Sequence, residues 1–242
     1  QSISGPNTAL NTIMAEELSQ FADELEGAED FNAALHTLIR NTLRDHQRII
    51  FNGNGYDEAW VEEAARRGLS NLTCTADALK TYLMPKHVQL FGKHGIFTRE
   101  ELAARNEIHL ENYCEVAGIE ARTMVDMVRR SIFPAVSAFS GDVAKAVAAK
   151  KSVLADLDCA AEEALLRRRS SLMAALTAGA DALEEALAHV PAGDAYEAAH
   201  YCKHTVCARM DSLRTVADAL EAITAASYWP YPTYTALLFS IK

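Results

Sequence analysis

The sequence lacks the features that would carry a chain into or across a membrane. Its 242 residues contain no uninterrupted apolar run of the roughly 18 residues that a membrane-spanning helix needs. The N-terminal segment QSISGPN has neither the basic region nor the apolar core of a secretory signal peptide. It also lacks an initiating methionine. We therefore expect no membrane partner, and we expect the chain to be part of a longer protein.

Positive charge is also scarce. The chain has 23 Lys and Arg residues against 33 Asp and Glu residues, which gives a formal net charge of −10. This balance repels nucleic-acid phosphates unless basic side chains gather locally. The densest basic run, Arg167, Arg168 and Arg169, lies beside Glu162 and Glu163 in a predicted helix. We interpret this run as a solvated helix face and expect no nucleic-acid partner.

The cysteines do not form the framework of a small disulfide-stabilised domain. There are five of them, dispersed at positions 74, 114, 159, 202 and 207. Small secreted domains instead carry dense, even-numbered sets of cysteines. The pattern indicates reduced thiols, and we expect a cytoplasmic protein.

What the sequence has in abundance is helical patterning. With 50% hydrophobic and 23% charged residues, the composition is that of a globular protein. Apolar residues at helical spacing predict a first helix that begins at Asn7 or Thr8 and ends at Gly27, and a second over 31–45. Between 48 and 97 the turn sequence NGNG precedes a helix that Asp57 caps and Gly68 ends. The stretches 74–83 and 87–95 predict short, irregular pieces.

Three long helices are predicted in the last part of the chain. The sequence TREE at 98–101 is a capping box that begins a helix running towards Arg130, kinked or broken at Pro134 and continuing to about Lys151. Two more helices, over 155–188 and 194–225, are joined by the tight connection VPAGD and should be antiparallel neighbours. The predicted fold class is all-α, a bundle of three long helices with shorter helices, irregular connections and no substantial sheet. We divide it into a helical pair over 1–47, a mixture of loops and short helices over 48–97, and a bundle of long helices with an aromatic C-terminal tail over 98–242.

The predicted helix faces indicate where the core lies. The last two long helices each carry an apolar stripe, and alanine in these stripes lets the two axes approach closely. The helix that TREE begins is less regular, because Asn106, His109 and Glu120 fall on its apolar face. Since buried polar groups need partners, these three residues predict either a structural network or a functional pocket.

No motif specifies a reaction. The sequence HYCKHTVC brings His200, His204 and Cys207 to one side of a helix, a spacing able to hold a metal, but there is no fourth ligand and the trio lies opposite the apolar stripe. The sequence NGNGY lacks both the spacing and the lysine of phosphate-binding loops. Glutamates at 107, 111 and 115 are typical of a solvated face. We predict no catalytic, cofactor-binding or metal-binding residue, with a metal site at His200, His204 and Cys207 as the alternative.

Six long stretches of the sequence occur in an order that one family shares. They are SISGPNTALNTIMAEEL, IIFNGNGYDEAWVEEAARRGLSNL, GIFTREELAARNEIHLENY, IEARTMVDMVRRSIFPA, MDSLRTVADALE and WPYPTYTALLFS. Together they resemble the C-terminal part of type III glutamine synthetase over nearly the whole chain. Between about Lys151 and Cys207 the resemblance does not extend beyond the helices themselves.

The resemblance implies a parent enzyme that joins glutamate and ammonia. In that family ATP phosphorylates the γ-carboxylate, and ammonia then displaces the phosphate. Magnesium or manganese ions and basic residues hold the phosphates. The enzyme is a ring homo-oligomer with active sites between neighbouring subunits. The family's metal-binding carboxylates and phosphate-clamping arginines lie on a β-sheet upstream of QSISGPN, so none of them maps onto this chain.

We therefore expect a helical C-terminal part with a structural or assembly role and no activity of its own. Its partners would be its own catalytic domain and neighbouring subunits of the ring. The alternative is a helical module that binds a regulatory protein or a small effector, which an open cavity lined by the polar residues at 106, 109 and 120 would favour. The end of the chain, YWPYPTYTALLFSIK, resembles the family's terminal segment. We expect Trp229 to pack on the chain's own helices, and Thr233 to cap a last helix through Phe239.

Overall fold

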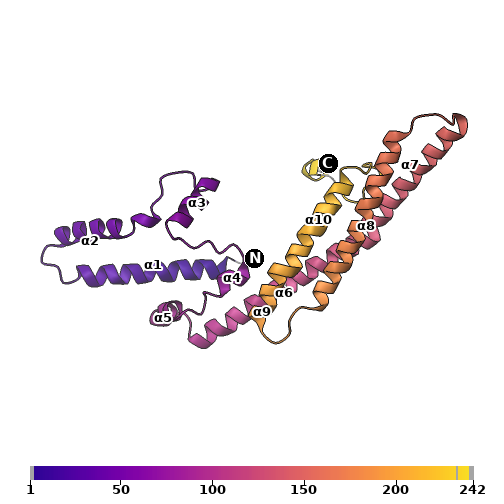
Figure 1. Cartoon of the computed structure of the whole chain (residues 1–242). Coiled ribbons are helices and arrows are strands. Elements are labelled where there is room, and N and C mark those ends of the chain that lie inside the picture. Colours follow the sequence, from indigo (N-terminus) through magenta and orange to yellow (C-terminus); the bar gives the residue numbers. More distant parts are fainter. Residues whose placement is uncertain (1–2, 233, 240–242) are drawn as a thin grey trace. The chain divides into compact units, whose positions relative to one another are not determined.

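The structure, a computed structural model, describes residues 3–232 and 234–239, and no strand occurs among them (Figure 1). The all-α prediction is confirmed. The chain divides into two compact units, Gln1–His109 and Leu110–Lys242, which we call unit 1 and unit 2 and describe separately. This division differs from the three predicted parts, which stay a prediction about domain boundaries.

Unit 1 consists of short helices and the beginning of one long helix. Its elements are α1 (Ser4–Leu25), α2 (Phe31–Asp45), η1 (Gln47–Ile49), α3 (Glu58–Arg66), α4 (Thr75–Leu79), α5 (Pro85–Lys93) and the first turns of α6 (Arg99–Met127). Helix α1 packs against α2 and α5. The Glu16 carboxylate on α1 joins these elements, because it binds Lys93 Nζ at 2.8 Å and His94 Nε2 at 2.7 Å near the end of α5.

Local capping explains several of these boundaries. The Asp30 carboxylate accepts a hydrogen bond from the Ala33 amide at 3.0 Å and begins α2, which has the predicted bounds. The Asp57 carboxylate accepts from the Ala59 amide at 3.3 Å and begins α3. Gly68, with φ of 70°, ends that helix in the left-handed conformation that glycine tolerates best.

One expectation for unit 1 was wrong. Helix α1 begins at Ser4, so Pro6 and Asn7 lie inside its first turn instead of before it. Proline fits there because the first amides of a helix have no partner within the helix. The stretch 48–97 contains short helices, as predicted. The pieces expected to be irregular are the regular helices α4 and α5, and Pro85 occupies the first position of α5.

The capping box at the start of α6 is confirmed. Thr98 Oγ1 accepts from the Glu101 amide at 3.2 Å, and Glu101 Oε2 accepts from the Thr98 amide at 2.8 Å. At its other end α6 continues through the π-helical turn η2 (Val128–Ile132) into α7 (Phe133–Val153). The Phe133 amide reaches the Val128 carbonyl, five residues back. This wider turn directly precedes Pro134, whose ring would crowd the carbonyl four residues before it in a regular α-helix.

The continuous stretch Arg99–Val153 also bears on the membrane expectation. By length and composition alone it is long and apolar enough to cross a membrane, a test that the core helix of a soluble protein passes too. The expectation that the chain has no membrane partner therefore stays a prediction.

Unit 2 is built around α8. Its elements are the rest of α6, η2, α7, α8 (Ala160–Ala188), α9 (Ala195–Tyr201), the π-helical segment η3 (Cys202–Cys207), α10 (Ala208–Glu221) and α11 (Tyr234–Leu238). Helix α8 packs against both α7 and α10, so the prediction that the last two long helices are neighbours is confirmed. Helix α8 starts at residue 160, five residues later than predicted, because 154–159 form the turn after α7.

The core of unit 2 follows the predicted apolar stripes. Leu176, Leu183, Leu213 and Leu220 are fully buried within one cluster that also takes in residues from α6 and η2. Trp229 and Tyr231 pack against the same cluster and are partly buried. Trp229 therefore packs on the chain's own helices, as expected. Thr233, expected to cap the last helix, lies outside the described residues.

Candidate functional site

The pair of histidines His200 on α9 and His204 on η3 does not form a metal site with the neighbouring cysteine. The His200 and His204 rings lie 4.2 Å apart, centroid to centroid, and both side chains are exposed. Cys207 instead approaches Tyr113 on α6, with 3.8 Å between Sγ and the tyrosine oxygen. Across residues 3–232 and 234–239, no three His, Cys, Asp or Glu side chains are grouped as metal ligands. The metal alternative assumed that His200, His204 and Cys207 follow one another at α-helical angles around the axis. The π-helical turn at 202–207 is wider than an α-helical one and changes these angles.

The polar residues of α6 do not line a cavity together. His109 and Glu120 are exposed, so the expectation that they lie on a buried face was wrong. Only Asn106 is partly buried, and its Oδ1 atom is buried without a hydrogen-bond partner. These residues therefore give no support to the alternative of an effector site on this face of α6.

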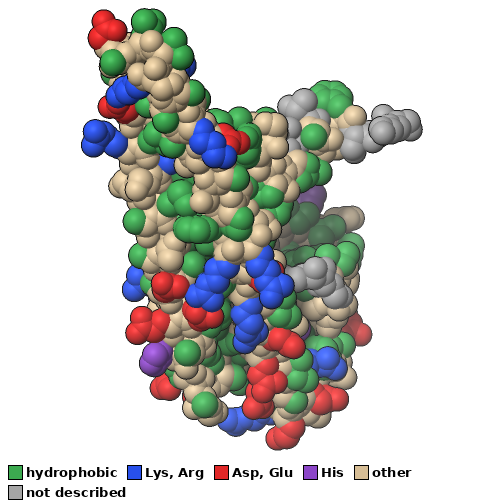
Figure 2. Space-filling model, turned by 90° about the vertical axis from the view of Figure 1, so that its right-hand side faces the viewer, with side chains coloured by type: hydrophobic (Ala, Val, Ile, Leu, Met, Phe, Trp, Pro, Cys, Tyr) green, Lys and Arg blue, Asp and Glu red, His purple; other side chains and the backbone are tan. Residues whose placement is uncertain are grey.

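The basic run on α8 is not uniformly solvated. Arg167 and Arg168 are exposed, as expected, but Arg169 is fully buried. Arg169 lies seven residues before Leu176, and this spacing puts it on the apolar stripe. On the face of the molecule drawn in Figure 2, basic side chains lie interspersed with acidic ones.

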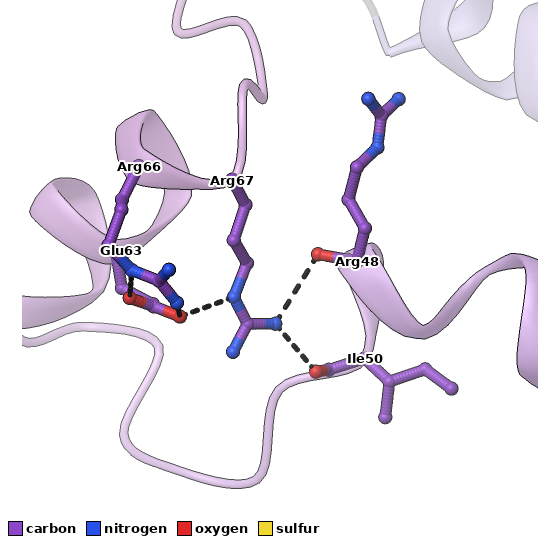
Figure 3. Close-up of polar contacts among 5 residues, drawn as sticks. All are labelled: Arg48, Ile50, Glu63, Arg66 and Arg67. Carbon is purple, nitrogen blue, oxygen red and sulfur yellow. Dashed lines mark hydrogen bonds and ion pairs between the residues drawn. The ribbon is translucent and has the colours of Figure 1, made fainter.

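Arg67 anchors the turn that contains NGNGY (Figure 3). Its Nη1 atom donates to the carbonyl oxygens of Ile50 at 2.8 Å and Arg48 at 3.3 Å. Its Nε atom donates to Glu63 Oε1 at 2.5 Å, and Arg66 binds the same carboxylate. The hydrogen bonds from Arg66 and Arg67 lower the pKa of Glu63 to about 2. The arginine thus fixes the backbone that enters the turn to the end of α3.

Aromatic stacking fills the interior of this turn. The Phe51 ring stacks on Trp60 with centroids 4.2 Å apart, and the Arg67 guanidinium lies 5.8 Å from the Phe51 centroid. A Cβ added to Gly53 would lie 2.5 Å from Phe51 Cζ. The space that a phosphate would need at this glycine is therefore taken by a ring. The Arg67 guanidinium is engaged with Glu63 and two carbonyls, so its donors hold the turn in place.

Two thiols of unit 2, those of Cys114 and Cys202, are not activated nucleophiles. Burial, followed by the neighbouring Cys114 thiol, raises the pKa of Cys202 to about 12. Burial also raises the pKa of Cys114. Since the thiolate is the reactive form, both groups are poor nucleophiles at neutral pH. All five cysteines are free.

Helix α1 exposes its apolar side and covers a polar one. Leu10, Met14 and Leu18 recur at four-residue spacing, and their exposed fractions are 62%, 57% and 59%. Ile13 lies beside them and is also exposed. The only buried residue of α1 is Thr12, whose hydroxyl donates to the Thr8 carbonyl. The orientation is the reverse of an ordinary amphipathic helix on a globular core.

The rest of unit 1 shows the same pattern. Helix α2 buries Leu38 but exposes Phe31, Ile39 and Leu43. Within the described part of residues 1–109, the buried hydrophobic residues are Leu38, Ala76, Phe91 and Leu102. Exposed apolar surface of this extent on neighbouring helices marks an interaction surface. We call the side chains of Leu10, Ile13, Met14 and Leu18 the α1 apolar surface.

Unit 2 contains a pocket of about 510 Å³ beside α10. Its lining comes from α10, the junction of α6 with η2, and the C-terminal segment. The residues are Met124, Met127, Val128, Ile132, Met210, Asp211, Leu213, Arg214, Ala217, Asp218, Glu221, Trp229, Tyr231, Pro232 and Leu237. No signal in the sequence identified this pocket, because its walls come from three separate segments.

Comparison with known proteins identifies similar chains. Residues 34–151 match the family model described as the glutamine synthetase C-terminal domain. The chain is 38% identical over 215 residues to a glutamine synthetase of Butyrivibrio fibrisolvens, covering 88% of this chain and 31% of that protein. It is 30% identical over 250 residues to a type-3 glutamine synthetase of Dictyostelium discoideum, covering 99% of this chain and 34% of that protein.

A glutamine synthetase of Bacteroides fragilis is 28% identical over 241 residues, covering 96% of this chain and 33% of that protein. The chain thus spans about a third of the length of the curated relatives that it matches. The resemblance noted from the sequence is confirmed.

Proposed function

We propose that this chain is the helical C-terminal part of an ATP-dependent glutamate–ammonia ligase, because residues 34–151 match the family model of the glutamine synthetase C-terminal domain. In this proposal its role is structural. Unit 1 packs against the catalytic domain of the same protein, and the chain supports assembly of a ring homo-oligomer. ATP and magnesium or manganese ions bind in the catalytic domain, and this chain alone makes no glutamine.

The observation that carries the proposal is the α1 apolar surface. Fully burying one such side chain contributes about 1.5–3 kcal/mol, and each of these four is about half exposed. Covering the remaining half of all four would therefore contribute roughly 4 kcal/mol to docking. Helix α1 buries Thr12 and leaves these four side chains exposed. Because unit 1 does not cover them, their apolar contacts would have to come from outside unit 1. The preceding part of the same protein is the nearest source of such contacts.

Other features of the chain support this role. Arg67 holds the backbone that enters the turn at 51–56, and the Phe51 ring lies against Gly53, which favours a structural role for this turn. The buried thiols Cys114 and Cys202 have raised pKa values. Free cysteines throughout the chain favour a reducing, cytoplasmic compartment.

The test places a charge on the α1 apolar surface of the full-length protein. We expect Leu18→Glu to weaken oligomer assembly and glutamine formation, because the carboxylate would be buried without a partner. In the chain alone, the same substitution should leave the melting temperature nearly unchanged, since Leu18 is exposed there.

Ala15→Glu is the matched control. It adds the same carboxylate at an exposed position of α1 outside the α1 apolar surface. We expect this variant to assemble normally. Normal assembly and activity of the Leu18→Glu protein would refute the proposed docking.

A further inference from the structure

We propose that the pocket beside α10 binds a small organic cation, an ammonium group attached to an aromatic or branched apolar body. The inference goes beyond the structural role proposed above. The lining of the pocket lies within residues 124–237, all in unit 2, so the inference rests on other residues than the α1 apolar surface.

The size and walls of the pocket suit a small apolar molecule. Its volume of about 510 Å³ falls within the roughly 300–1,000 Å³ typical of ligand-binding pockets. Three methionines, at 124, 127 and 210, line it together with Leu213 and Ile132. Methionine side chains adapt to ligands of irregular shape. Leu213 and Ile132 belong to the buried core, so the floor of the pocket is rigid.

The charged side chains that line the pocket indicate whether it favours a positively or a negatively charged ligand. Four of the lining residues are charged, and three of these are acidic. The single cation, Arg214, donates from Nε to Asp218 at 2.5 Å, so this pair is internally neutralised. Asp211 and Glu221 then leave two negative charges at the pocket. A cation is the complementary ligand, and an anion would be repelled.

The aromatic side chains add a second reason for a cation. Trp229 and Tyr231 line the pocket and pack against the core of unit 2. The Trp229 amide donates to the Ala225 carbonyl at 3.2 Å, which ties this residue to the end of α10. Pro232 restricts the backbone that follows. Held tryptophan and tyrosine rings attract cations through their faces.

The experiment uses this whole chain and three probes of similar shape. Phenethylammonium, 2-phenylethanol and phenylacetate differ mainly in charge. The chain has two tryptophans, Trp60 and Trp229, so a Trp60→Phe variant leaves Trp229 as the fluorescence reporter. Calorimetry on the unmodified chain provides a second readout. We expect saturable binding of phenethylammonium, weaker binding of the alcohol and the weakest binding of the carboxylate.

Substitutions at the pocket complete the test. Asp211 and Glu221 lie ten residues apart on α10, about 15 Å along its axis, so one ammonium group pairs with only one of them. One of the two variants Glu221→Gln and Asp211→Asn should therefore weaken phenethylammonium binding about two- to fivefold, the range of an exposed ion pair, and both should leave the alcohol unaffected. Asp156→Asn, at the turn after α7, is the control and should change neither. The proposal is overturned if phenethylammonium shows no saturable binding, if phenylacetate binds as tightly, or if the two pocket variants match the control.

Discussion

Replacing Arg169 with methionine tests how unit 2 tolerates a buried charge that has no acidic partner. Arg169 is fully buried on α8, and its Nε and Nη2 atoms donate to the Ile223 carbonyl at 3.1 and 2.5 Å. Its guanidinium carbon lies 3.7 Å from the centroid of the Phe139 ring. Its Nη1 atom is buried without a partner, and burial lowers the pKa of the guanidinium. The hydrogen bonds to Ile223 and the contact with Phe139 thus stabilise the buried guanidinium, whereas the unpartnered Nη1 atom destabilises it.

The magnitude follows from these contacts. The charged donor to the Ile223 carbonyl, just beyond α10, contributes about 2 kcal/mol, and the contact with Phe139 adds roughly 1 kcal/mol. The unpartnered Nη1 group costs about 1 kcal/mol, which methionine removes while filling most of the volume. We therefore expect Arg169→Met to lower the free energy of unfolding by about 2 kcal/mol.

Urea denaturation followed by circular dichroism measures this difference. Arg168→Met is the matched control, since Arg168 is the exposed neighbour in the same run, and its effect should stay within about 0.5 kcal/mol. A double-mutant cycle with Phe139→Leu should give a coupling of about 1 kcal/mol. An Arg169→Met protein as stable as the unmodified chain, or more stable, would show that desolvation outweighs both contacts and would refute this reasoning.

Three further predictions concern single contacts. Glu16→Gln should destabilise unit 1 at neutral pH. Hydrogen bonds from Lys93, Gln20 and His94 lower the Glu16 pKa from 4.5 to about 2, so its contribution is present above pH 4.5 and fades as the pH falls towards 2. Denaturation midpoints of both proteins should therefore converge at acid pH, and a constant difference would contradict this. Gly53→Ala should cost about 1–3 kcal/mol through the Phe51 ring, whereas Gly55→Ala, with open space around it, should cost far less. Equal thermal melts would count against the packing described for the turn. Trp229→Ala should cost unit 2 about 2 kcal/mol, because the ring is partly buried on its core, and an unchanged denaturation midpoint would instead favour docking elsewhere.

The elements of the fold were predictable where local chemistry decides them. The Asp57 cap, the TREE box and the glycine at 68 each act within a few residues, and the structure contains them all. The start of α1 was wrong, and the short helices expected in 48–97 were not given the bounds of α4 and α5. At those places tertiary packing and the tolerance of a first turn for proline outweigh the local turn signal.

Burial was predictable only where sequence spacing and side-chain chemistry agree. The leucine stripes of α8 and α10 became the core of unit 2. Arg169 lies on the same stripe, but its charge led to a solvated interpretation, and the carbonyl and ring that receive it come from distant segments. The outward direction of the α1 apolar surface was equally hidden, because periodicity identifies an apolar face without saying what covers it.

The most direct test of the account compares the α1 apolar surface in the chain alone and in the full-length protein. Hydroxyl-radical footprinting reports the solvent exposure of Leu10, Met14 and Leu18 individually. We predict strong labelling of all three in the chain alone and sharply reduced labelling in the full-length protein. Val153, an exposed residue at the end of α7, should label equally in both and serves as the reference. Equal labelling of Leu10, Met14 and Leu18 in the two proteins would contradict the claim that this chain docks on its catalytic domain through α1.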